Sequence, residues 1–141
     1  MAYISEQLRQ QIVERAQGRC EYCQTQQVIV VSMEIDHVVP ASVGGETTLA
    51  NLCLACVGCN SFKLDSQMGT DPETGQQAPL FNPRVQDWHD HFQWSDDGLY
   101  MVGVSLVGRV TIARLKMNRE VMVEARRRWV MAGWHPPHSG R

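Results

Sequence analysis

Two Cys-x-x-Cys pairs constrain this chain more than any other feature of its sequence. Cys20 and Cys23 form the first pair, Cys56 and Cys59 form the second, and residues 24–55 separate them. Two thiolates at this spacing bind one side of a zinc ion from a tight turn, and a second pair closes the tetrahedron, leaving no open position for chemistry. The sequence therefore predicts a structural Zn2+ site. Because the separation exceeds that of a simple zinc ribbon, we expect another structural unit between the pairs.

The alternative use of the four cysteines is two disulfides, which an intracellular protein seldom keeps. The chain starts MAYISEQLRQQ, without the basic and apolar regions of a secretory signal, and its longest apolar runs are too short to cross a bilayer. We therefore expect a cytoplasmic protein with no membrane span. The fifth cysteine, Cys53, is expected to be a small buried hydrophobic residue.

The spacing of apolar residues, together with turn and cap residues, predicts a mixed α+β chain of 141 residues. Ser5 is expected to cap an N-terminal helix that ends near Gly18, and Asn118 is expected to cap the last helix. The other predicted elements are strands over 27–35, about 52–54 and 99–107, helices over 60–64, 110–117 and 119–132, and a long loop over 65–79.

Four polar residues stand close to the cysteine pairs and need a chemical explanation: Asp36, His37, Asn51 and Asn60. A carboxylate at a strand end and an amide on a facing helix supply hard oxygen ligands, which suit Mg2+ or another divalent ion that keeps several waters. Between them an imidazole can take a proton from water near neutral pH, and a second amide can fix the ring by a hydrogen bond.

The segment from about Gly18 to Lys63 resembles the HNH endonucleases and their zinc-braced ββα-metal fold. The likeness rests on the stretches GRCEYC, EIDHVVP, GG and NLCLACVGCNSFK. It implies that Asp36 and Asn60 hold a catalytic Mg2+ or Mn2+, that His37 is the general base, and that Asn51 orients His37. Asn60 replaces the final His of the founding pattern, as in the HNN variant. The resemblance also implies phosphodiester hydrolysis that leaves a 5′-phosphate and a 3′-hydroxyl.

The charge of the chain is unevenly distributed. Residues 1–108 carry 5 Lys and Arg against 13 Asp and Glu, a net charge of -8, whereas residues 109–141 carry 8 against 2, a net charge of +6. A basic C-terminal stretch can approach phosphates while an acidic remainder holds a metal. Lys63, Arg126 and Arg127 are the predicted nucleic-acid-binding residues, and a solvent-exposed helix face is the alternative interpretation of each.

These observations predict one α+β domain over residues 1–141. It has a ββα-metal core at about 18–65, an N-terminal helix, a linker loop at 65–79 and a C-terminal helical extension at 80–141 that covers the core. We expect a metal-dependent endonuclease that acts on DNA, with RNA as an alternative substrate. Cutting both strands would need a homodimer or two successive events. Two other functions stay open at this point: a zinc-stabilised nucleic-acid-binding module that does not cut, and an interaction domain.

Overall fold

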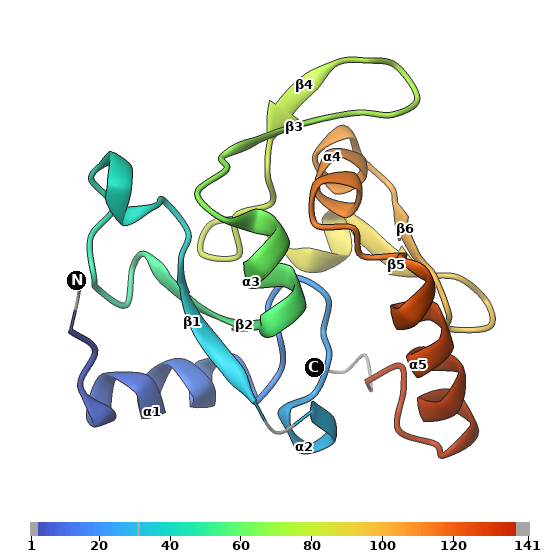
Figure 1. The fold of residues 1–141 in the computed structure, drawn as a ribbon, viewed down its shortest axis with the longest axis horizontal. Coiled ribbons are helices and arrows are strands. Elements are labelled where there is room, and N and C mark those ends of the chain that lie inside the picture. The colour runs from blue at the N-terminus through green and yellow to red at the C-terminus, as the bar shows by residue number, and fades with distance from the viewer. Residues whose placement is uncertain (1–2, 31, 138–141) are drawn as a thin grey trace.

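The computed structural model describes residues 3–30 and 32–137 and has the predicted α+β class (Figure 1). Its helices and strands are α1 (Glu6–Arg15), α2 (Gln27–Val30), β1 (Met33–His37), β2 (Leu52–Cys56), α3 (Val57–Lys63), β3 (Met68–Thr70), β4 (Gln77–Pro79), β5 (Phe92–Trp94), β6 (Met101–Gly103), α4 (Leu106–Arg114) and α5 (Glu120–Met131). Short 3-10 turns cover Ala41–Val43 and Trp88–Asp90. No helix within 3–30 or 32–137 has the length and hydropathy of a membrane span.

The centre of the molecule is the antiparallel β1–β2 hairpin followed directly by α3, which gives the predicted ββα order (Figure 1). The register runs from Met33 opposite Cys56 to His37 opposite Leu52. Successive side chains of a strand point to opposite faces, so Glu34 and Asp36 share one face of β1 and His37 lies on the other.

Different elements cover the two faces of the hairpin. Ile12 of α1 is fully buried against Leu52 and Leu54 of β2, and Ser5 caps α1 by accepting a hydrogen bond from Leu8 N at 3.1 Å. On the other face α3 contacts both strands. This arrangement leaves the C-terminal end of β1, where Asp36 and His37 lie, between α3 and the loop that leads to β2.

Residues that follow β4 pack against the cysteine pairs. One buried cluster joins the four paired cysteines to apolar residues of the extension, which include Phe81, Phe92, Met101, Leu115 and Met117. Trp88 Nε1 donates to the main-chain oxygen of Tyr22 at 2.9 Å, and Trp94 Nε1 donates to Gln24 Oε1 at 3.1 Å. These apolar residues cover a small core, and the burial of apolar surface from both sides stabilises that core.

The predicted strand over 27–35 is wrong in its first half. Gln27–Val30 form the one-turn helix α2, and pairing with β2 begins only at Met33; Val31 lies outside the described residues. Two features explain the difference. Gln27 N donates to Gly18 O at 2.7 Å, which returns the chain to the start of the cysteine turn, and β2 ends at Cys56, so no partner strand extends beyond Met33.

The predicted loop over 65–79 contains a hairpin, because β3 and β4 pair around a turn that starts at Asp71. The Asp71 carboxylate is fully buried, accepts hydrogen bonds from Glu73 N and the Thr74 hydroxyl, and pairs with Arg109 at 3.1 Å. These contacts fix a turn whose polar composition predicts only a loop.

The predicted strand over 99–107 shrinks to β6 because Ser105 caps α4, whose first residue is Leu106. The predicted helix over 110–117 therefore begins earlier and ends at Arg114. Asn118 is not the cap of α5; its amide instead bridges Met101 N and Met101 O at 2.9 and 2.8 Å, and Arg119 occupies the cap position.

Candidate functional site

The four predicted zinc ligands lie together. The sulfur atoms of Cys20, Cys23, Cys56 and Cys59 are all within 4.8 Å of one another, and those of Cys23 and Cys56 are 3.7 Å apart. A tetrahedron with Zn–S bonds of about 2.3 Å has sulfur–sulfur edges of about 3.8 Å, so this spacing fits one zinc ion. No disulfide is present among the five cysteines. The cluster indicates zinc binding, and the disulfide alternative is wrong.

Local hydrogen bonds prepare the sulfur atoms for a metal. In each pair the main-chain N–H of the second cysteine donates to the first sulfur at 3.4 Å. The hydroxyl of Thr25 lies 3.1 Å from Cys23 Sγ. Hydrogen bonds from the three other thiols, with a smaller contribution from Thr25, hold the pKa of Cys23 well below its ordinary value. Burial raises the pKa of Cys20, and hydrogen bonds from the other thiols raise the pKa of Cys59, so among these three cysteines only Cys23 favours the thiolate form that binds metals.

Arg126 of α5 balances the charge of this centre. Arg126 is 1% exposed, and its guanidinium donates to Leu99 O and Met117 O at 3.0 and 2.6 Å. It forms no ion pair with a carboxylate of the described chain. Burial lowers its pKa, and the nearby cysteine sulfurs oppose that effect. Zinc with four thiolates carries a charge of +2 and four times -1, or -2, which a buried guanidinium complements.

Asp36 lies in a buried network on the α3 side of the hairpin. The carboxylate accepts a hydrogen bond from the Tyr22 hydroxyl at 2.8 Å and pairs with the Lys63 ammonium at 3.2 Å. Lys63 also donates to the main-chain oxygens of His37 and Val38 at 3.2 and 3.3 Å. The network therefore ties the end of α3 to the end of β1.

Cys53 belongs to the same network and is buried, as the sequence predicts. Burial raises the pKa of its thiol, and the Asp36 carboxylate raises it further. Its sulfur lies 3.5 Å from the Tyr22 hydroxyl. Cys53 is thus a neutral thiol that packs beside Asp36 and takes no part in the four-cysteine cluster.

Asn60 contacts Glu34, a residue that the sequence analysis did not select. Its amide nitrogen donates to the Glu34 carboxylate at 2.6 Å. Because Glu34 and Asp36 lie two residues apart on one face of β1, and Asn60 and Lys63 lie one turn apart on α3, the four side chains form a single polar layer between strand and helix. Its two carboxylates and one amide are the kind of oxygen donors that fit Mg2+ or Mn2+.

His37 extends from the opposite face of β1 into the loop over residues 38–50. Its Nε2 lies 2.9 Å from the hydroxyl of Thr47, which is the one side-chain hydrogen bond of the ring within the described residues. Asn51 does not hold the ring directly as expected. Its amide instead accepts from Val39 N at 2.9 Å and donates to Val39 O and Glu46 O at 3.0 and 2.9 Å, so it braces both arms of the loop.

The Gly44-Gly45 pair has a structural reason in this loop. Gly44 has a φ of 95°, a conformation that glycine adopts without strain. At Gly45 a Cβ atom would lie 1.7 Å from Val39 O, so no side chain fits. The two glycines let the loop close onto the Asn51 amide, and this closure places Thr47 beside His37.

The structure divides the four predicted catalytic residues into two groups along the hairpin. Asp36 and Asn60 belong to the polar layer under α3, whereas His37 and Asn51 belong to the loop on the other side. The Lys63 ammonium links the groups, because it contacts both the Asp36 carboxylate and the main-chain oxygen of His37. Within the described chain, no hydrogen bond between two side chains joins one group to the other.

The predicted nucleic-acid-binding residues need two corrections. Lys63 is 2% exposed and held by Asp36, so it is a buried cation and not a surface lysine that reaches phosphate. Arg126 is buried beside the cysteine cluster, as described above. Arg127 is exposed and forms a salt bridge with Glu124 at 3.0 Å.

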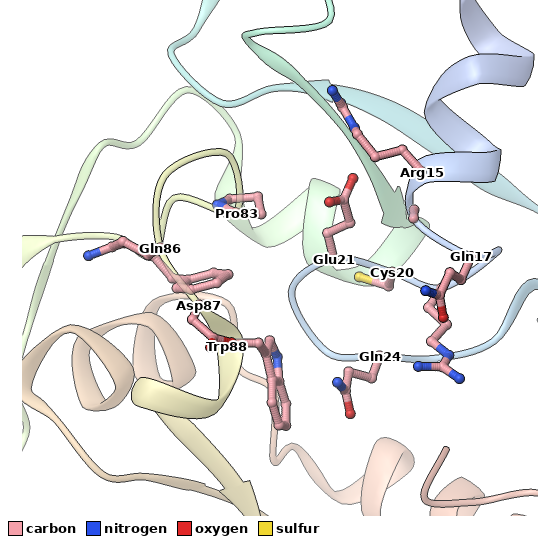
Figure 2. Close-up of a pocket in the computed structure, with 12 residues that line it drawn as sticks. Arg15, Gln17, Cys20, Glu21, Gln24, Pro83, Gln86, Asp87 and Trp88 are labelled. Carbon is pink, nitrogen blue, oxygen red and sulfur yellow. The ribbon is translucent and has the colours of Figure 1, made fainter. Parts of the chain in front are cut away.

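A pocket on the outer side of the first cysteine pair does not belong to the candidate catalytic centre (Figure 2). Figure 2 shows Arg15 and Glu21 on one side of it and Gln86 and Trp88 on the other. The Glu21 carboxylate accepts a hydrogen bond from Leu54 N at 2.9 Å and pairs with Arg84, so its charge is neutralised. None of the four predicted catalytic residues lines this pocket.

Three residues of the site escaped the sequence analysis: Tyr22, Glu34 and Thr47. Glu34 had a usable signal, since it stands two residues before Asp36 and a strand places such residues on one face. Tyr22 lies between two cysteines and Thr47 in a polar loop, and neither position indicates a partner.

Comparison with known proteins agrees with this geometry. Residues 20–65, which include both cysteine pairs, the hairpin and α3, match the family model described as HNH endonuclease. A match to this family implies nuclease-type activity and a nucleic-acid substrate. Neither a curated protein nor a solved structure matches the chain.

Proposed function

We propose that this chain, whose residues 20–65 match the HNH endonuclease family model, is a metal-dependent endonuclease that hydrolyses phosphodiester bonds of DNA. The single observation that carries the proposal is the position of this segment's polar residues. Asp36 and His37 end β1 and Asn51 bonds the loop that follows, whereas Asn60 contacts Glu34 near the start of the strand, on a hairpin held by a four-cysteine cluster.

His37 would act as the general base. Its ring would take a proton from the water that attacks phosphorus, and a positioned base of this kind contributes roughly a hundred- to ten-thousand-fold in rate. Thr47, 2.9 Å from Nε2, fixes the ring, and Asn51 acts through the loop that carries Thr47. Asn51 is thus a positioning residue in this proposal.

Asp36 and Asn60, with Glu34 beside them, would hold the divalent ion. Bound there, Mg2+ or Mn2+ supplies Lewis-acid stabilisation of charge on the phosphate and on the departing 3′ oxygen. The Lys63 ammonium lies 3.2 Å from the Asp36 carboxylate and pairs with it in this buried position. The products would be a 5′-phosphate and a 3′-hydroxyl.

A plasmid-nicking assay with added Mg2+ or Mn2+ tests the proposal. We expect the unchanged chain to nick DNA and His37→Ala to lose roughly a hundred- to ten-thousand-fold in rate while keeping its zinc. His89→Ala is the matched control, because His89 is an exposed histidine that packs on Trp88, away from the hairpin. Equal rates for His37→Ala and His89→Ala would refute the assignment. Salt-dependent DNA binding without cleavage would identify a binding module instead.

A further inference from the structure

Three cations lie at the end of α4 and on the segment that joins α4 to α5, and none of them has a carboxylate partner within the described chain. We call Arg114, Lys116 and Arg119 the basic strip. Lys116 is exposed, and the two arginines are half-exposed. Every salt bridge of the described residues involves other cations. The acidic neighbours Asp65 and Glu120 are exposed and form no ion pair with the strip.

The basic strip follows α3 from its beginning to just beyond its end. Arg119 lies over the ring of Phe62 at 4.9 Å and so close to Gly58 that a Cβ there would be 2.4 Å from its Nη2. Lys116 Nζ is 5.2 Å from the same ring. Figure 1 shows the segment between α4 and α5 passing beside α3.

The far end of the strip approaches the candidate catalytic centre. Arg114 donates to the Ser66 hydroxyl at 3.0 and 2.6 Å, and Ser66 N donates to Lys63 O at 3.0 Å. Lys63 in turn contacts the main-chain oxygen of His37. A path of direct contacts therefore leads from Arg114 to the end of β1.

The length of the strip suits a nucleic-acid backbone. The seven residues of α3 span about 10 Å at 1.5 Å per residue. One strand of a DNA duplex carries a phosphate about every 3.4 Å along the helix axis, so the strip can face about three phosphates. Unpaired arginine and lysine side chains beside a half-buried aromatic ring form the kind of surface that contacts such a backbone.

The geometry points to the basic strip as the surface that binds the DNA backbone beside the candidate catalytic centre. This inference rests on the proposed function and assigns its substrate contacts. The strip takes the place of Lys63 and Arg126, which are buried, and of Arg127, which Glu124 neutralises. Arg109 is likewise neutralised by Asp71.

Binding of a short DNA duplex, followed by fluorescence anisotropy over a range of salt concentrations, tests the inference. All chains carry His37→Ala so that the duplex stays intact. The triple variant Arg114→Gln, Lys116→Gln, Arg119→Gln is compared with Arg127→Gln, which removes an exposed arginine outside the strip. The slope of log K against log salt is negative, and each lost phosphate contact makes it less steep by about 0.9. We therefore expect the steepness to decrease by roughly 2 to 3 for the triple variant and to stay unchanged for the control.

The outcomes separate this inference from the proposed function. An unchanged slope in the triple variant, together with His37-dependent cleavage by the unchanged chain, overturns the inference and leaves the function. Binding that depends on the strip without any cleavage supports the inference and overturns the nuclease proposal. Absence of DNA binding by the parent chain overturns both. Zinc content and circular dichroism of the triple variant establish that its fold is retained.

Discussion

Replacement of Arg126 by methionine should reveal how the C-terminal helix depends on the metal centre. The substitution keeps a flexible apolar side chain but removes the charge and the hydrogen bonds to Leu99 O, Met117 O and Asn118 Oδ1. Leaving a buried acceptor without its donor costs about 1–3 kcal/mol of unfolding free energy. The acceptors left behind are buried or half-buried, so water cannot fully replace the lost donor.

Part of this loss should depend on zinc. The guanidinium lies near a centre whose charge is -2 when zinc binds four thiolates. Without zinc, the raised pKa values of Cys20 and Cys59 keep these thiols uncharged, so the centre is less negative. Outer groups that stabilise a metal site typically change metal affinity by about 10- to 100-fold, or roughly 1.4–2.8 kcal/mol. We therefore expect Arg126→Met to weaken zinc binding by that factor.

Two measurements check this expectation: competition for zinc against a chromogenic chelator, and urea unfolding of the zinc-loaded chain. Arg127→Met is the matched control, because it is the next residue of α5 but half-exposed and paired with Glu124. The control should lose less than about 1 kcal/mol and bind zinc normally. A zinc affinity unchanged by Arg126→Met, despite lower stability, would refute the electrostatic part of the reasoning.

Three further predictions concern the buried polar groups. Burial, and then the charge of Arg126, lower the pKa of His135 to about 4 from an ordinary 6.5. On acidification the unfolded chain therefore takes up a proton at this histidine before the folded chain does, and the free energy of unfolding should fall between pH 6.5 and 4 by at most about 3 kcal/mol. Urea titrations of His135→Gln should not show this fall. Cys59→Ser should reduce zinc binding and abolish the cooperative thermal transition, whereas the same scan should show a folded Cys53→Ser. Lys63→Met should lose about 3–5 kcal/mol in urea unfolding because Asp36 is left buried without its cation, and a loss below 1 kcal/mol would show that the pair is unimportant.

The parts of the fold that the sequence predicts well are those set by local chemistry. Cys-x-x-Cys spacing admits few geometries around a metal, so the cluster followed from spacing alone, whereas the ββα order between and after its halves was implied by the resemblance. The apolar pattern of α1, with its Ser5 cap, was equally local. The predicted division into core, linker and extension, and a homodimer, stay predictions.

Several of the wrong expectations concern charged or polar groups whose partners lie far away in sequence. Lys63 is buried because Asp36, 27 positions earlier, neutralises it. In the run 126–128 one arginine faces the core together with Val123, one turn earlier, and the sequence does not show which face main-chain acceptors will occupy. The hairpin at β3 and β4 likewise depends on Asp71 meeting Arg109, 38 positions later.

The contacts that Arg84, Trp88 and Trp94 make to the first cysteine turn limit how the segment 20–65 can be transferred between proteins. The recognisable stretch stops at residue 65, yet the side chains that clasp Glu21, Tyr22 and Gln24 come from beyond it. A gene fragment that ends at residue 65 and is fused to another protein would encode the candidate catalytic residues without the side chains that contact the first cysteine turn. The segment 20–65 and the residues that follow it should therefore be transferred together, or the new protein must supply equivalent contacts.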